Sequence, residues 1–381
     1  MEKPKILFIT HAYHNRGGVE EHLKVILNEF ASKAECFTAF PMNSEIHLLR
    51  GTSPDPIEVF PGTSLDLIAP LTDPLVEESY SKIFEFVQPD VIHLMHFAYW
   101  PISIVKCVAT SPVKRIVSFH DFYLLTPQFT MMGRSDVENF CSREYCEATL
   151  GKDLSGYMEN RRSLLSECLP QFQHRLVPSH FLERTLQRVH RVSFDVLPYG
   201  IPSFPASPSR KKNSKKKKII FGYLGALLPQ KGCQSLLTAF QGIQEQFPHA
   251  ELHLYGSAKS TPENLKQIFF HGGYSQEDLP TIMNSIDIGI IPSVFPETYS
   301  IVLSELWQAQ KPVAVSNIGA LAERVLDGVN GRKFTPGNPA AIAEVLTWFM
   351  TSEEWRDFET PTPFTAQEMA QQLWGWYSTD L

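Results

Sequence analysis

The sequence predicts an α/β protein of two Rossmann-like, doubly wound domains that face each other across a cleft. Short apolar runs of strand length alternate with longer amphipathic runs of helix length, a pattern typical of βαβ units and parallel sheets. The alternation stops once, in a stretch rich in Pro, Ser and Lys, and then restarts. The length of 381 residues also suits two domains better than one.

The expected domains follow from where the alternation stops and restarts. We expect an N-terminal domain at residues 1–200, a linker at 201–218, a C-terminal domain at 219–355 and a C-terminal segment at 356–381. In the first half the apolar periodicity predicts strands at 5–10, 91–95, 116–119 and 192–197, and helices at 19–32, 77–87 and 181–190. In the second half it predicts strands at 219–224, 251–255, 267–271 and 286–291, and helices at 233–246 and 364–377.

Composition limits the classes of function. A net charge of -7 argues against a dedicated nucleic-acid binder. No run approaches the roughly 20 apolar residues of a membrane span, and six scattered cysteines favour a reducing compartment. We therefore expect a cytoplasmic protein whose contact with the inner face of a membrane is at most peripheral. The run Lys215 to Lys218 could bind anionic lipid headgroups or serve as a solvated linker.

Two carboxylates give the clearest indication of chemistry. Glu297 and Glu305 are separated by seven residues at the entry into an apolar, helix-like run. Eight helical rises cover about 12 Å, roughly the reach of a sugar diphosphate from its hexose to its ribose. Free N–H groups at the helix start would suit the diphosphate. The alternative is an ordinary helix glutamate and a first-turn acid, but the preceding strand 286–291 ends where ligands bind in open α/β sheets.

The segment from Asp287 to Gly331 resembles the donor-binding segment of retaining family 4 glycosyltransferases, members of glycosyltransferase group 1 with the GT-B fold. The resemblance implies that Glu305 holds the ribose hydroxyls and that Glu297, as a catalytic residue, lies beside the donor sugar and diphosphate. The same loop would bind the donor through Pro296, Thr298, Tyr299 and Ser300. The commoner family form has Phe-Gly at the position of Tyr299-Ser300, and this departure leaves the identity of the donor more open. The resemblance also implies that the last helix crosses back to the first domain.

In the N-terminal domain, Gly17 and Gly18 follow the first strand and open a helix, where a backbone can approach a ligand closely. The alternative is a flexible turn. The resemblance implies that both glycines contact the donor diphosphate, and Arg16 is a further candidate for a phosphate or acceptor contact.

Three histidines at strand ends are candidates in the same domain. His120 follows the strand at 116–119, and the resemblance gives it a catalytic place against a sugar hydroxyl. A histidine at a strand end is more often structural. His93 and His96 are weaker candidates for the acceptor side.

In the C-terminal domain, Lys231 would bring a positive charge to the diphosphate. As a mere exposed lysine at a helix start it would oppose the helix dipole. The family usually has an arginine five residues earlier, where this chain has Ala226, so a second cation must come from elsewhere or donor binding is weaker. The resemblance implies that Gly273 and Tyr274 contact the nucleobase through their backbone, which leaves UDP and GDP both open.

The expected reaction is hexose transfer from a UDP- or GDP-linked sugar, as co-substrate, to a glycan or lipid-linked acceptor in polysaccharide biosynthesis. No Asp-x-Asp pair stands in a suitable loop and no motif nominates a base for inversion. The resemblance therefore implies a retaining reaction without metal or other cofactor. A sugar-nucleotide epimerase and a non-catalytic binding partner remain alternatives. A zinc site of Cys141, Cys146, Cys168 and His174 has loose spacing, and packing of these cysteines is favoured.

Overall fold

The computed structural model describes residues 3–14, 17–63, 66–132, 136–204, 218–258 and 265–379. The chain divides into two compact units, which are residues 1–200 with 365–381 (unit 1) and residues 201–364 (unit 2). Arg16 and the lysines from Lys215 to Lys217 lie outside the described residues.

Unit 1 is built on an eight-stranded sheet of order β4-β3-β2-β1-β5-β6-β7-β8. Its strands are β1 (Lys5–Ile9), β2 (Glu35–Met42), β3 (Glu45–Arg50), β4 (Glu58–Pro61), β5 (Val91–Leu94), β6 (Lys114–Ser118), β7 (His174–Val177) and β8 (Asp195–Val196). Strand β1 pairs in parallel with both β2 and β5. The strand order therefore changes direction between β1 and β5, which is the switch point of this sheet.

One edge of this sheet departs from the predicted parallel arrangement. Strands β2, β3 and β4 form an antiparallel meander. Asn43 and Ser44 connect β2 to β3 with φ angles of 53° and 64°. Positive φ at both central residues is the backbone of a tight two-residue hairpin turn. The prediction of parallel sheets is wrong at this edge because a short turn replaced the expected helical crossover.

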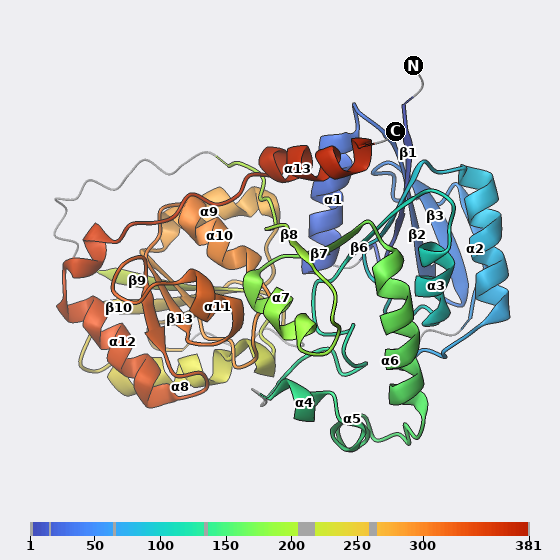
Figure 1. Ribbon diagram of the computed structural model, residues 1–381. Helices are drawn as coiled ribbons and strands as arrows, with labels where there is room; N and C mark the ends of the chain where they lie inside the picture. The colour runs from blue at the N-terminus through green and yellow to red at the C-terminus, as the bar shows by residue number, and fades with distance from the viewer. Residues whose placement is uncertain are drawn as a thin grey trace. The chain divides into compact units, whose positions relative to one another are not determined.

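Helices cover both faces of the unit 1 sheet. They are α1 (Gly18–Phe30), α2 (Pro74–Val87), α3 (Ser103–Ala109), α4 (Val137–Phe140), α5 (Arg143–Leu150), α6 (Tyr157–Cys168), α7 (His180–Gln187) and α13 (Ala366–Ser378), with a 3₁₀ turn at Leu169–Gln171. The C-terminal α13 lies beside α1 (Figure 1), where the ring of Trp374 meets Phe30 at 5.4 Å. Buried Tyr377 contacts the same phenylalanine, so aromatic side chains fix α13 to unit 1.

Unit 2 is built on six parallel strands of order β11-β10-β9-β12-β13-β14. They are β9 (Ile219–Leu224), β10 (Ala250–Tyr255), β11 (Ile268–Phe270), β12 (Ile288–Ile291), β13 (Val313–Ser316) and β14 (Arg332–Phe334). Counted within the unit, this is the order 3-2-1-4-5-6 of a dinucleotide-binding fold. The switch point lies between β9 and β12. From there the chain connection after β9 leads toward β10, and the connection after β12 leads the other way, toward β13.

Alternate residues of the unit 2 strands face two separate cores. Phe221 and Tyr223 of β9 pack with α8 and α12, whereas Ile220 and Leu224 pack with α9 and α10. The sheet is therefore doubly wound, and α8 and α12 lie together on one face (Figure 1). The helices are α8 (Cys233–Ile243), α9 (Leu279–Ser285), α10 (Ile301–Gln308), α11 (Gly319–Arg324) and α12 (Pro339–Thr351), with 3₁₀ turns at Pro229–Lys231, Gln276–Asp278 and Glu354–Asp357.

Within the ranges described above, no helix combines the length and the apolar character needed to cross a membrane.

Candidate functional site

The loops after β9 and β12 meet at the switch point of unit 2. The amide of Val294 donates to the carbonyl of Gln230 at 2.9 Å. Gly232 has a φ of 71°, and a Cβ there would lie 1.8 Å from the carbonyl oxygen of Pro292. Only glycine allows this approach. The two loops that carry the predicted donor residues are therefore held against each other by backbone.

Lys231 and Glu297 form an ion pair across these loops. Lys231 Nζ lies 2.8 Å from Glu297 Oε1, and Ser293 Oγ donates to the same oxygen at 2.6 Å. The ammonium also lies 5.0 Å from the centre of the Phe295 ring. The Glu297 side chain is 10% exposed and that of Lys231 33% exposed. The predicted diphosphate cation and the predicted catalytic carboxylate thus share one small site.

A second backbone contact supports Glu297 from the far side. The amide of Ala320 donates to the Glu297 carbonyl at 2.8 Å. The neighbouring Gly319 has a φ of 59°, and a Cβ there would lie 2.6 Å from that carbonyl oxygen. Sequence reasoning missed Gly319, the first residue of α11, although the strand-like run Val313 to Ser316 just before it places it at the same end of the sheet.

Glu305 lies on α10, and its side chain is buried, at 5% exposure. Its Oε1 accepts a hydrogen bond from Gln276 Nε2 at 3.3 Å. Burial, and secondarily the Glu305 carboxylate, raises the pKa of the Tyr274 phenol. Tyr274 and Glu305 are therefore neighbours, as two parts of one nucleoside site would be. Gln276 was not predicted.

The backbone at Gly273 and Ser300 bears on ligand approach. A Cβ at Gly273 would have open space around it, which suits the predicted backbone contact with a base. Ser300 precedes α10 with φ 71° and ψ 91°, and its side chain does not cap the helix. This serine thus holds a left-handed conformation in which the glycine of the commoner family form would be unstrained. Pro296 and Thr298 flank Glu297 in the same loop.

Ala226 stands where the family has an arginine, and it belongs to a tightly packed turn. Tyr223 Oη donates to the Ala226 carbonyl at 2.7 Å. A Cβ at Gly256 would lie 1.7 Å from the carbonyl oxygen of Gly225. The loops after β9 and β10 therefore touch at this point, and the turn carries no cationic side chain at Ala226.

In unit 1, His120 belongs to a cluster of aromatic rings at the carboxyl ends of β1, β5 and β6. Its Nδ1 lies 2.5 Å from Tyr199 Oη, and the ring of His22 lies 5.5 Å away. Burial lowers the pKa of His120 well below its ordinary value, and nearby histidines add to this effect. His120 is therefore neutral near pH 7 and can act as a hydrogen-bonding group rather than a cation.

His93 and His96 occupy different environments in this cluster. His93 is 1% exposed, with Nε2 2.7 Å from Ser118 Oγ and Nδ1 hydrogen-bonded to Tyr377 Oη. These bonds favour a structural role for His93 over its predicted place on the acceptor side. His96 Nε2 lies 3.3 Å from Asp121 Oδ2, and its Nδ1 accepts from the amide of Ala98.

Gly17 and Gly18 begin α1, as predicted, beside an unpredicted carboxylate. Buried Glu20 lies over Gly17, so that a Cβ there would be 2.3 Å from Glu20 Oε2. Its Oε1 is 3.5 Å from His11 Nε2. Burial raises the pKa of the Glu20 carboxyl, which favours its neutral form.

The cysteines considered for zinc pack in the interior instead. Cys141 and Cys168 belong to the main core of unit 1, and Cys146 packs in a smaller cluster with Leu154 and Met158. His174 is 2.9 Å from Asp195. Among the residues with described positions, no three His, Cys, Asp or Glu side chains are grouped to hold a metal ion.

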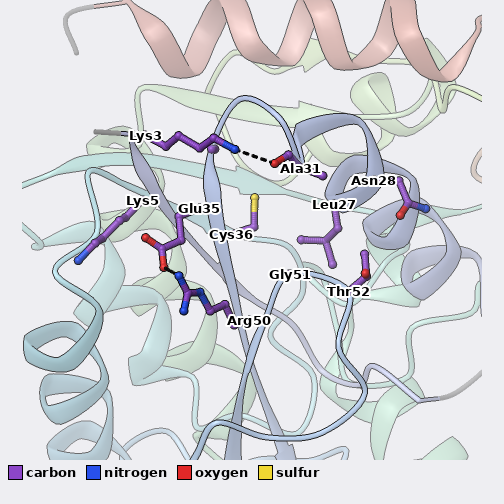
Figure 2. Close-up of a pocket in the computed structure, with 11 residues that line it drawn as sticks. Lys3, Lys5, Leu27, Asn28, Ala31, Glu35, Cys36, Arg50, Gly51 and Thr52 are labelled. Carbon is purple, nitrogen blue, oxygen red and sulfur yellow. Dashed lines mark hydrogen bonds and ion pairs between the residues drawn. The ribbon is translucent and has the colours of Figure 1, made fainter. Parts of the chain in front are cut away.

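A cavity of about 640 Å³ lies elsewhere in unit 1, at the amino ends of β1 and β2 (Figure 2). Cys36 and Leu27 line its apolar part, and the ion pair between Arg50 and Glu35 borders it. No predicted site residue lines this cavity, which is at the opposite end of the sheet from His120.

Comparison with solved structures defines the class of fold. HepE of Anabaena, in a crystal structure with UDP and glucose, matches 99% of this chain and 100% of its own with a TM-score of 0.67 and 18% identity. Sucrose-phosphate synthase of Thermosynechococcus elongatus matches 98% of both chains with a TM-score of 0.68 and 16% identity. At these identities the likeness shows the fold alone. The fold is GT-B, which confirms the prediction.

Residues 207–360, which make up most of unit 2, match the family described as Glycosyl transferases group 1, and this match confirms the predicted resemblance to group 1. Two uncharacterized glycosyltransferases of Methanocaldococcus jannaschii are 29% and 34% identical over 137 residues, or 35% and 34% of this chain. Phosphatidyl-myo-inositol mannosyltransferase of Mycobacterium leprae is 28% identical over 137 residues, or 34% of this chain. The matches span 39%, 34% and 36% of these relatives' lengths.

Proposed function

We propose that the chain is a retaining, metal-independent glycosyltransferase that moves a hexose from a nucleotide-diphosphate sugar to a hydroxyl of a glycan or lipid-linked acceptor. The observation that carries the proposal is the placement of Lys231, Glu297 and Glu305 around the switch point of a group 1 domain. The similar proteins, which are named as glycosyltransferases and a phosphatidyl-myo-inositol mannosyltransferase, support the activity. The UDP and glucose in the HepE structure support the donor class.

Each side chain has a defined task in this proposal. Lys231 exchanges its contact with Glu297 for the donor diphosphate, whose charge is also met by the free N–H groups at the start of α10. Glu305 accepts hydrogen bonds from the ribose hydroxyls. Glu297 then faces the sugar.

The reaction itself needs no protein base. The bond between the anomeric carbon and the leaving phosphate oxygen breaks, and the acceptor oxygen bonds to the same face of that carbon. The acceptor proton passes to the leaving phosphate oxygen. In this mechanism Lys231 and backbone N–H donors neutralise the charge of the diphosphate.

Calorimetric titration with UDP, GDP, ADP and their hexose conjugates tests the proposal. We expect tight binding of one nucleotide to the wild type, loss of binding in Glu305→Ala, and unchanged binding in Glu245→Ala, which removes an exposed glutamate of the same unit. If no nucleotide bound to the wild type, the enzyme proposal would fail in favour of a non-catalytic partner. The arginine that is missing at Ala226 would then account for the lack of donor binding. Epimerisation without acceptor would instead support the epimerase.

The stereochemistry and metal dependence are tested separately on the product. NMR of the new glycosidic linkage should show the anomeric configuration of the donor, and activity should survive EDTA. An inverted linkage, or an absolute requirement for a divalent cation, would contradict the retaining, metal-independent mechanism.

We also propose a cytoplasmic location, in which all six cysteines stay reduced as they are here, and a role in polysaccharide biosynthesis with peripheral membrane contact through Lys215 to Lys218. Lys218 is 2.5 Å from Glu251, which reduces its own share in such contact. Replacing the four lysines with glutamine should weaken sedimentation with anionic vesicles. Unchanged sedimentation would contradict the membrane contact.

A further inference from the structure

Arg324, the last residue of α11, contacts the entry of α10 at several points. Its Nη1 donates to the carbonyls of Tyr299 and Ser300 at 2.7 and 3.0 Å. Its Nη2 donates to Ser304 Oγ at 2.7 Å. These three bonds join one guanidinium to both residues before the helix and to the residue next to Glu305.

The same guanidinium lies between two aromatic rings of this segment. Its Cζ is 4.0 Å from the centre of the Tyr299 ring and 5.2 Å from that of Trp307. Tyr299 and Trp307 are both buried. Arg324 therefore braces α10 from before its first turn to its last, and the planar fork of an arginine suits this combination of stacking and paired hydrogen bonds.

The brace acts where the backbone is strained. Ser300 has a φ of 71°, a left-handed conformation that is strained for a non-glycine residue and persists only where its surroundings hold it. Its hydroxyl makes no capping bond to α10. The hydrogen bond from Arg324 to the Ser300 carbonyl is a direct restraint on this peptide.

We propose that Arg324 is a positioning residue of the donor site, which holds Ser300 in the left-handed conformation and so fixes the start of α10 and the place of Glu305. This inference rests on the proposed function for its effect on nucleotide binding. The link between Arg324 and Ser300 is a property of the fold and can be measured without any ligand.

A double-mutant cycle of full-length variants tests the inference. The variants are Arg324→Met, Arg324→Lys, Ser300→Gly and the double variant Arg324→Met/Ser300→Gly. Glycine adopts the left-handed conformation without a restraint. The double variant should therefore recover most of what Arg324→Met loses, and Arg324→Lys should lie between the wild type and Arg324→Met because lysine cannot form the fork.

The first readout is calorimetric affinity for UDP and GDP. Arg324→Met should weaken binding of the preferred nucleotide roughly tenfold or more, in line with lost charge-assisted hydrogen bonds. The Ser300→Gly variant is the reference for the double variant, because it alone shows what removal of the serine hydroxyl does to binding. Arg324→Met should cost much less affinity in the Ser300→Gly background than in the wild type. The same fold-loss in both backgrounds would overturn the inference and leave Arg324 as a packing residue between two rings.

The second readout is the urea midpoint of unfolding, which separates this inference from the proposed function. If the wild type bound neither nucleotide, the proposed function would fail, whereas a smaller drop in midpoint on Arg324→Met in the Ser300→Gly background than in the wild type would still support the Arg324–Ser300 restraint. Additive midpoints would overturn the restraint even if the wild type bound nucleotide tightly.

Discussion

Lys231 Nζ and Glu297 Oε1 lie 2.8 Å apart, so two residues with separate predicted tasks form a single ion pair. Their burial is unequal, since the lysine side chain is 33% exposed and the glutamate side chain 10% exposed. Water can solvate the ammonium without its partner, but it has little access to the carboxylate. The carboxylate of Glu297 therefore depends more on the ammonium of Lys231 than the ammonium depends on the carboxylate.

This asymmetry predicts the stability of variants at the pair. Lys231→Met should destabilise the protein by about 1–3 kcal/mol, because it leaves a buried carboxylate with Ser293 as its remaining neutral donor. Glu297→Gln should cost less, because the amide oxygen still accepts from Ser293 and the freed ammonium is hydrated. Urea unfolding measures both free energies.

The double variant Lys231→Met/Glu297→Gln is the control for this prediction. It should be more stable than Lys231→Met alone, since the buried charge is gone. If Lys231→Met were as stable as Glu297→Gln, the carboxylate would not depend on the lysine.

The contact between Gly319 and Glu297 gives a second prediction. Gly319→Ala should destabilise unit 2 by about 2 kcal/mol or more, because the new Cβ overlaps the Glu297 carbonyl oxygen and φ is positive. Nucleotide affinity should fall as well, since Glu297 moves. Thermal unfolding and calorimetry measure the two effects.

Gly242→Ala is the matched control. Gly242 lies in α8 with open space where a Cβ would be, so alanine there should be neutral or stabilising by up to about 1 kcal/mol. A Gly319→Ala variant as stable as Gly242→Ala would show that the Glu297 loop tolerates displacement.

Sequence patterns located the core of the candidate site because they are local. The apolar runs that become β9 and β12 are each followed by a turn and by Lys231 or Glu297, so the carboxyl ends of two strands could be identified without the fold. Contacts between distant segments left no such pattern. Gln276 reaches Glu305 across 29 positions, and Arg324 reaches Ser300 across 24.

Missed elements also have physical causes. The sequence of α6 is polar and gives no amphipathic pattern, yet Arg161 on this helix is 1% exposed. Its guanidinium donates to the carbonyls of Leu124 and Tyr123 and lies 5.0 Å from the Tyr123 ring. From sequence alone an arginine is expected at the surface, because the distant carbonyls that accept its hydrogen bonds in the interior leave no local pattern. The strand expected at 192–197 shortens to Asp195–Val196, since a turn bonds Val192 to His190.

The histidine cluster of unit 1 predicts a loss of stability in acid. Burial lowers the pKa of His11 to about 2 and those of His22 and His93 to about 3, from an ordinary value of 6.5. The unfolded chain therefore binds more protons than the folded chain once the pH falls below about 6.5. Stability is fully present above that pH and decreases toward pH 3, by up to about 1.4 kcal/mol per pH unit for each such histidine.

Replacing one histidine should reduce this slope. His22 packs against Tyr199 at 4.4 Å between ring centres, and its Nδ1 has no hydrogen-bond partner among the described residues. His22→Leu should flatten the dependence of the unfolding free energy on pH between 6 and 4 by up to about 1.4 kcal/mol per unit.

His249→Gln, which removes an exposed histidine of unit 2, should keep the wild-type slope. Urea titrations at several pH values, with hydrogen exchange to locate the opening in unit 1, provide the measurement. Identical slopes in wild type and His22→Leu would mean that His22 remains unprotonated in the unfolded chain too, or that it takes up its proton without loss of the fold, and either result contradicts the linkage.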